Sequence, residues 1–209
     1  MQTIEFLLAQ HARGHVAAMS GSAGPLLMDQ LLAGLGEDEL RARPAPYLNS
    51  IAWLLWHLAR SEDVLVNALL ADTVQILDTA DWSSRLDLAE RDMGTGMTSA
   101  QVDAVSVRVA LPALLDYQIA VGQRTRAYIT SLRQDDWAGM VEPQRLLAVG
   151  AFANPVDGAL RVEGYWRGRT RADLLVSALA PHNFQHLGEA LAIKSMLNAK
   201  VSVPVRSLG

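Results

Sequence analysis

The sequence predicts an all-α protein built as a helix bundle, and three observations support this. Long stretches of the chain place apolar residues at helical spacing. Strand candidates are confined to residues 139–168. No flexible linker divides the segments that would form the core, so the 209 residues are expected to fold as one domain, 1–209. Half of the residues are hydrophobic and 19% are charged, which is enough apolar material for a sizeable core.

Two helical stretches separated by a break are expected at the start of the chain. Residues 2–19 carry apolar side chains and two histidines at a helical period. The segment GSAGP at 21–25 interrupts this pattern, because glycine and proline are poor helix formers. The stretch LLMDQLLAGLG then continues as helix and is expected to stop at Gly34 and Gly36.

The next long helix is expected to begin near residue 50. The preceding GEDELRARPAPY is interpreted as a polar connection, because Pro44 and Pro46 end any helix there. Asn49 or Ser50 can accept a hydrogen bond from a free N–H of the first turn and so cap the helix. The apolar pattern runs on to about Ala71, which predicts a helix of that length.

A third long helix is predicted from a capping signal. Thr98 and Gln101 have the spacing of a capping box, in which each side chain bonds the other residue's backbone N–H. The helical pattern that follows extends to about Leu132. Pro112 lies within it and is expected to kink or split the helix, because proline lacks the N–H of a helical hydrogen bond.

The segment 139–168 has a different character. RLLAVGAF and ALRVEGYW are short, apolar-rich and separated by the turn signal NPVDG, so a small β-hairpin or ordered loop insertion is expected. Thr170 and Asp173 form another capping-box pattern and should open the last helix, which runs to about Asn198. The final KVSVPVRSLG is expected to be an extended tail.

Composition excludes several classes of function. The formal net charge of −4 gives no general attraction to nucleic acid or to an anionic membrane surface. The absence of cysteine excludes disulfides, thiolate metal ligands and a cysteine nucleophile. No run of about 18 apolar residues indicates a membrane span, and the N-terminal stretch with Glu5 does not resemble a signal peptide, so a cytoplasmic location is expected. No Ser-His-Asp spacing, Gly-rich phosphate loop or basic helix array is present.

Three of the five histidines have the placement that a metal site in a helix bundle requires. His182 and His186 are four residues apart and therefore share one face of the last helix. His57 lies in the apolar stretch AWLLWHLA, with Trp53 one turn earlier and expected in the pocket wall. Three protein ligands with one open position are typical of catalytic zinc sites. Neutral imidazole also suits Ni²⁺, Fe²⁺ and Cu²⁺, so the pattern does not select one metal.

Simpler interpretations compete with this one. A lone histidine on an apolar face is usually a satisfied core residue, and helices pair histidines by chance. His11 and His15 form a second pair at the same spacing. Because Arg13 and Gly14 adjoin it, this pair is expected to be partially exposed on the first helix. Two alternatives remain, in which the pair lines the same cavity or substitutes as metal ligands.

Two carboxylates are candidates for supporting roles. Glu189 lies three residues after His186, on nearly the same helix face, and could orient a ring N–H or act as a general base. A solvated carboxylate with no role in the site is the competing interpretation of Glu189. Glu62 follows His57 by five residues, off its direct face, and is expected to pair with Arg60 or with a neighbouring helix.

Two blocks of the sequence resemble the DinB-like (YfiT-like) metalloproteins. GLGEDELRARPAPYLNSIAWLLWHLARSED is similar to the entry into their second helix, with a Leu-x-x-x-Pro-x-Pro stretch, then Ser-Ile-Ala-Trp and His-Leu-Ala. HNFQHLGEALAIK resembles their last helix, with its His-x-x-x-His-x-Gly segment. The resemblance implies a four-helix up-down-down-up bundle. It also implies one divalent metal ion, with zinc or nickel favoured, bound by His57, His182 and His186, and open positions for water or substrate.

The resemblance further implies a metal-dependent enzyme, because this group includes transferases and an isomerase that use a low-molecular-weight thiol. The expected partner is therefore a small-molecule substrate, for example a low-molecular-weight thiol. Two alternatives stay open: a non-catalytic, stress-related bundle whose ion only joins the helices, and an interaction protein without metal. A homodimer is expected in each case, because bundles associate through spare apolar faces. The GSAGP break and the 139–168 segment look like additions to the family pattern.

Overall fold

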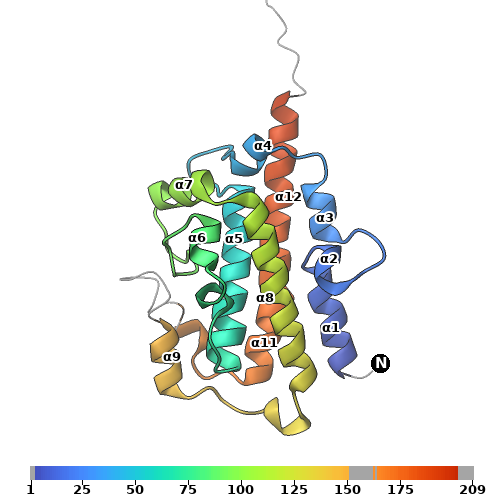
Figure 1. Ribbon diagram of the computed structural model, residues 1–209, viewed down its shortest axis with the longest axis vertical. Coiled ribbons are helices and arrows are strands. Elements are labelled where there is room, and N and C mark those ends of the chain that lie inside the picture. The colour runs from blue at the N-terminus through green and yellow to red at the C-terminus, as the bar shows by residue number, and fades with distance from the viewer. Residues whose placement is uncertain (1–2, 151–161, 163, 202–209) are drawn as a thin grey trace, which may run out of the picture.

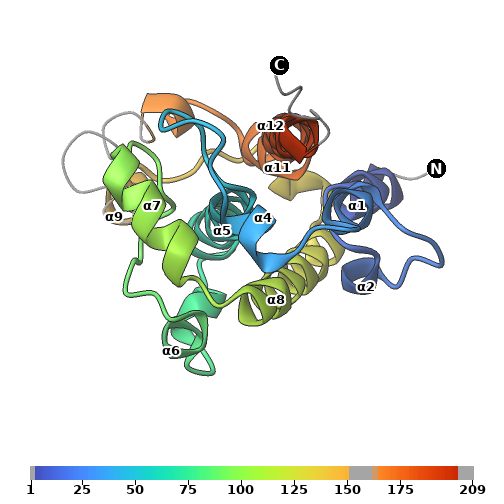
Figure 2. The ribbon, with the colours of Figure 1, turned by 90° about the horizontal axis from the view of Figure 1, so that it is seen from above.

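The structure, a computed structural model, describes residues 3–150, 162 and 164–201. Its long axis is formed by α1 (Thr3–Arg13), α5 (Ile51–Glu62), α8 (Leu111–Ser131) and α12 (Pro181–Val201). Figure 1 shows α1 and α12 running in one direction and α5 and α8 in the other. This is the up-down-down-up arrangement that the family resemblance implies. In the view from above, α5 lies inside the bundle between α8 and α12 (Figure 2).

The first helical region is divided more finely than the sequence predicts. The expected helix over 2–19 consists of α1 and α2 (Ala17–Ser20), and α3 (Leu27–Leu32) follows the GSAGP break. The chain leaves the helix at Gly14, where a Cβ atom would lie 3.0 Å from the Asn183 side chain of α12. Glycine therefore weakens the helix and lets α12 approach closely. The expected polar connection contains one short helix, α4 (Glu37–Arg41).

The second long helix begins as predicted. Ser50 is the N-cap of α5, and its Oγ accepts a hydrogen bond of 2.9 Å from the backbone N–H of Trp53. Every residue of α5 is buried. The helix continues as the π-helix η1 (Asp63–Leu70), which ends within one residue of the predicted position. Asp63 is fully buried at this transition and accepts hydrogen bonds from Arg60, Tyr117 and two backbone N–H groups of the short 3₁₀-helix that follows.

The third helical region is split at proline, as expected. After the short elements η2 (Ile76–Asp78) and α6 (Trp82–Leu86), the Thr98–Gln101 capping box opens α7 (Ser99–Arg108). The next helix, α8, carries Pro112 in its first turn, where no helical N–H partner is needed. No single described helix is long and apolar enough to span a membrane, whereas α7 and α8 together meet the criteria of length and composition but are bent by 98° at their junction.

The predicted β-hairpin is wrong where the structure describes it. After η3 (Gln134–Asp136), the first expected strand forms the helix α9 (Pro143–Gly150). Its buried residues Leu146, Val149 and Gly150 follow a helical period, and Pro143 starts the helix. The expected turn lies outside the described residues, and residues 162 and 164–166 of the second expected strand are helical. Within the described ranges, β-pairing is limited to one isolated bridge between Met140 and Thr170.

The last helical region is also divided. The Thr170–Asp173 capping box opens α11 (Arg171–Leu179) as predicted, but the chain breaks at Ala180 before α12 begins at Pro181. Proline disfavours helical geometry in the residue before it, and Ala180 has φ −130° and ψ −71°. Helix α12 runs through Val201, so the part of the expected tail up to that residue is helical, and 202–209 lie outside the described residues. After this break, His182 in the first turn of α12 contacts His57 of α5.

Candidate metal centre

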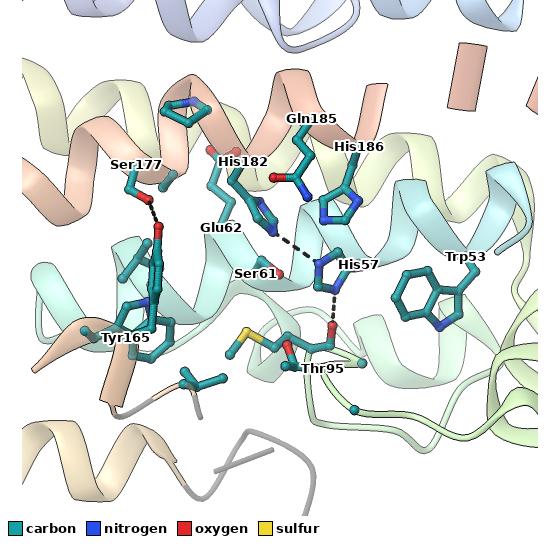
Figure 3. A pocket seen from close by; sticks show the side chains of 18 residues that line it. Trp53, His57, Ser61, Glu62, Thr95, Tyr165, Ser177, His182, Gln185 and His186 are labelled. Carbon is teal, nitrogen blue, oxygen red and sulfur yellow. Dashed lines mark hydrogen bonds between the residues drawn. The ribbon is translucent and has the colours of Figure 1, made fainter. Parts of the chain in front are cut away.

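Three imidazoles from two helices meet at one point of the bundle (Figure 3). His57 comes from α5, and His182 and His186 come from the first turns of α12. Their ring centroids are 4.8–5.1 Å apart, and one ligand atom from each lies within 4.8 Å of the others. His57 is buried, and the other two rings are partly exposed. The structure thus brings together the three residues that the sequence analysis selected.

The orientation of His57 is fixed from two sides. Its Nδ1–H donates to the backbone carbonyl of Met93, so Nε2 carries a lone pair. The Trp53 ring stacks on the imidazole with a centroid distance of 4.9 Å and an interplanar angle of 6°. Gly94 lets the loop pass close to α5, because its φ is +84° and a Cβ atom would lie 2.7 Å from Trp56 and 2.8 Å from Trp53. Trp53 therefore lies in the pocket wall, as expected.

His186 is oriented by a carboxylate. Its Nδ1–H donates to Glu189 at 2.9 Å, and the other oxygen of Glu189 accepts a 2.8 Å hydrogen bond from the Asn49 amide. Burial of Glu189 acts to raise its pKa, but the hydrogen bonds from His186 and Asn49 outweigh burial, so its pKa is lowered. The carboxylate is ionised at neutral pH and leaves the Nε2 lone pair of His186 free to face the cluster centre.

The donor set fits a metal ion. The Nε2 atoms of His57 and His182 are 3.2 Å apart, while the tautomer of His57 puts a lone pair on its Nε2. Neighbouring ligands around a zinc or nickel ion with bonds near 2.0–2.1 Å are separated by about 3.3 Å in tetrahedral geometry. A shared cation therefore suits this spacing of nitrogen atoms, and the carbonyl and carboxylate acceptors on the far ring nitrogens are the outer partners that metal-bound histidines usually have.

Protonation hardly competes with metal for two of these ligands, His57 and His182, near neutral pH. Burial, followed by the nearby His182 and His186, lowers the pKa of His57 to about 3. Burial, followed by His186, lowers the pKa of His182 to about 4. Both rings are therefore neutral at pH 7, which is the form that binds metal.

A cavity of about 530 Å³ opens beside the cluster. Figure 3 shows Tyr165 and Thr95 across the cavity from the residues of α12, with the Tyr165 hydroxyl 3.1 Å from the Ser177 hydroxyl of α11. Trp53, Leu65 and Trp166 add apolar walls. The described residues that line the cavity include no lysine or arginine. The cavity can therefore hold a small, largely apolar molecule against the histidine cluster.

A second cluster contradicts the expectation for the first histidine pair. His11 and His15 are 0% and 4% exposed, not partially exposed, and both contact the buried carboxylate of Glu62. Glu62 thus pairs with a neighbouring helix, one of its two expected partners, and also lines the cavity. Arg60 instead contacts Asp63, Tyr117 and Gln75. Because α8 and α11 pack against α1, the local sequence around His11 and His15 does not report their burial.

Sequence reasoning missed the loop that carries Met93 and Gly94. This loop contributes the backbone carbonyl of Met93 and the close approach of Gly94 to α5. Neither contact depends on a type of side chain that could be recognised in the sequence. The glycines in RDMGTGM are the available signal, because Gly94 and Gly96 both have positive φ. The supporting role of Glu189, in contrast, follows from its spacing to His186.

Comparison with known proteins agrees with this architecture. A family model described as the DinB superfamily matches residues 25–190. A crystal structure titled as a conserved protein of locus from Enterococcus faecalis superimposes with a TM-score of 0.69 at 21% identity, over 95% of this chain and 99% of that chain. At this identity the likeness establishes the fold. No curated protein matches the sequence significantly.

Proposed function

Because this chain belongs to the DinB superfamily, we propose that it is a metal-dependent transferase that uses a low-molecular-weight thiol. His57, His182 and His186 would hold one divalent ion, Zn²⁺ or Ni²⁺. The proposal rests mainly on one observation: three imidazoles, two of them with outer acceptors, converge at the wall of a cavity. Three imidazole ligands leave positions open on the cavity side.

The chemistry of the cavity suits a thiol and an electrophilic partner. A bound divalent ion supplies Lewis-acid activation and favours the thiolate form of a coordinated thiol. In the proposed reaction the sulfur forms a bond to an electrophilic carbon, the bond to the leaving group breaks, and the thiol proton departs with that group. The apolar walls formed by Trp53, Leu65 and Trp166 would hold the acceptor and exclude water. Because the chain has no cysteine, the sulfur must come from a cosubstrate.

The proposal is tested by metal content and turnover. Tag-free protein, His57→Ala and His186→Ala are analysed for Zn and Ni, and each is then assayed with small thiols and an aryl halide acceptor. Ser195→Ala is the control, because this exposed side chain is on α12 but lies outside the cavity lining and outside both clusters. We expect both histidine variants to lose one metal equivalent and the turnover, whereas the control keeps both. Equal metal content in the histidine variants and the wild type would contradict the assignment.

A non-catalytic metal-binding bundle is the second candidate. It is favoured by the position of the cluster between α5 and α12, two packed helices that an ion would join. The two candidates differ in turnover and not in metal content. Metal bound by the wild type, together with no thiol transfer to a panel of acceptors, would favour this second function.

A further inference from the structure

The cluster of His11, His15 and Glu62 is separate from the three-histidine centre. His11 and His15 share one face at the C-terminal end of α1 and the turn after it, and Glu62 ends α5. The Nε2 atoms of His11 and His15 lie 2.9 Å and 3.0 Å from the two carboxylate oxygens of Glu62. All three side chains are at least nine-tenths buried. A buried carboxylate with two imidazoles is a costly arrangement that calls for a physical reason.

Charge is the first part of the argument. Glu62 places an acidic side chain in a cluster that is shielded from solvent, since it is 3% exposed. From α8, Arg126 adds positive charge near His11 while donating to the Leu8 carbonyl at 2.9 Å. The cluster itself therefore holds a carboxylate and two imidazoles away from solvent, where a bound cation would complement the acidic side chain.

Geometry is the second part. One ligand atom from each of the three residues lies within 4.8 Å of the other two. The Nε2 atoms of His11 and His15 each face one oxygen of the same carboxylate, at 2.9 Å and 3.0 Å, so the three groups converge on one centre. Two imidazoles and one carboxylate are also a ligand set found in zinc enzymes.

The outer contacts of this cluster are the third part. The Nδ1 atoms of His11 and His15 are buried and have no hydrogen-bond partner among the described residues. Both rings therefore make their polar contacts only at the cluster centre. At the three-histidine centre, by contrast, the far nitrogens of His57 and His186 have acceptors. Loss of such outer acceptors weakens metal binding by about 10–100-fold.

We propose that His11, His15 and Glu62 form a second site for one divalent transition-metal ion. The site is independent of the proposed transferase function, and it binds more weakly than the three-histidine centre, because its imidazoles lack outer acceptors. Since Glu62 also lines the cavity, the ion would lie at the cavity wall.

The test counts ions. Protein stripped with a chelator is dialysed against Zn²⁺, and bound zinc per chain is measured for four proteins: wild type, Glu62→Gln, His186→Ala and the double variant. We expect two, one, one and zero equivalents. Glu62→Gln keeps the size of the side chain and removes its charge. The control is Glu142→Gln, an exposed carboxylate before α9, which should keep two equivalents. Co²⁺ absorption of the single variants should differ, because their ligand sets differ.

The outcomes separate the two hypotheses. One equivalent in the wild type, kept in Glu62→Gln and lost in His186→Ala, would overturn the second site and leave the transferase proposal intact. One equivalent kept in His186→Ala and lost in Glu62→Gln would support the second site and overturn the three-histidine one. If Glu62→Gln does not fold by circular dichroism, His11→Gln replaces it with the same expected counts.

Discussion

Replacing Glu189 offers a direct measure of how far the surroundings of His186 support metal binding. The carboxylate is half-buried, accepts the His186 N–H at 2.9 Å and is itself held by Asn49 at 2.8 Å. Loss of an outer carboxylate typically weakens metal affinity by about 10–100-fold, or about 1.4–2.7 kcal/mol. Glu189→Gln keeps an oxygen acceptor but removes the charge, which roughly halves the strength of the hydrogen bond. We therefore expect about a tenfold loss for Glu189→Gln and a loss near the upper limit for Glu189→Ala.

The assay is competition for Zn²⁺ against a chromophoric chelator, in a Glu62→Gln background so that the second cluster does not contribute. Asn49→Ala is the matched control, because it removes one hydrogen bond to Glu189 and leaves the His186 contact in place. It should weaken binding less than Glu189→Gln does. An affinity of Glu189→Ala within about twofold of the parent would refute the orienting role of this carboxylate.

Three further predictions concern the pocket and the core. First, the metal-free protein should lose stability as the pH falls, because burial lowers the pKa of His57 from 6.5 to about 3 and the unfolded chain binds this proton first. The loss should begin near pH 6.5 and continue toward pH 3, at up to about 1.4 kcal/mol per pH unit from this ring. In urea unfolding at several pH values, the free energy of unfolding of His57→Gln should depend less steeply on pH than that of the wild type. Second, Gly94→Ala should weaken zinc binding and lower the melting temperature more than Gly34→Ala, because both glycines have positive φ but only the Cβ at Gly94 meets other atoms within 4 Å; equal effects would contradict the close approach. Third, Asp63→Asn should cost about 3–5 kcal/mol in urea unfolding by leaving buried Arg60 without its ionic partner, and a change below about 1 kcal/mol would contradict the account of that network.

Local signals in the sequence correctly predicted the starts of several helices. Ser50, Thr98 and Thr170 cap helices where expected, because a cap depends on residues within one turn. Pro112 marked the split before α8 for the same reason. The break at Pro181 carried an equally local signal, but the continuous apolar pattern across it suggested one helix. The 139–168 segment was misjudged, because short apolar runs fit a strand and a buried helix equally well.

The histidines show where local reasoning ends. Spacing alone grouped His182 with His186, and apolar context added His57. The same reasoning placed His11 and His15 near the surface, because Arg13 and Gly14 adjoin them. Their burial is decided by the helices that cover α1, which no local pattern of the chain reports. The single-domain assignment, the homodimer, the thiol cosubstrate and the cytoplasmic location remain predictions.

The sequence by itself determined that the chain forms helices, where several of them begin, and which three imidazoles are candidates to share one ion. These properties depend on helical periodicity and on residues within a turn of one another. Only the tertiary structure decided which ring nitrogens face the centre, because the Met93 carbonyl and the contact of Asn49 with Glu189 come from other parts of the chain. It also decided that Glu62 meets His11 and His15, because packing between α1 and α5 brings together groups 47 and 51 residues apart.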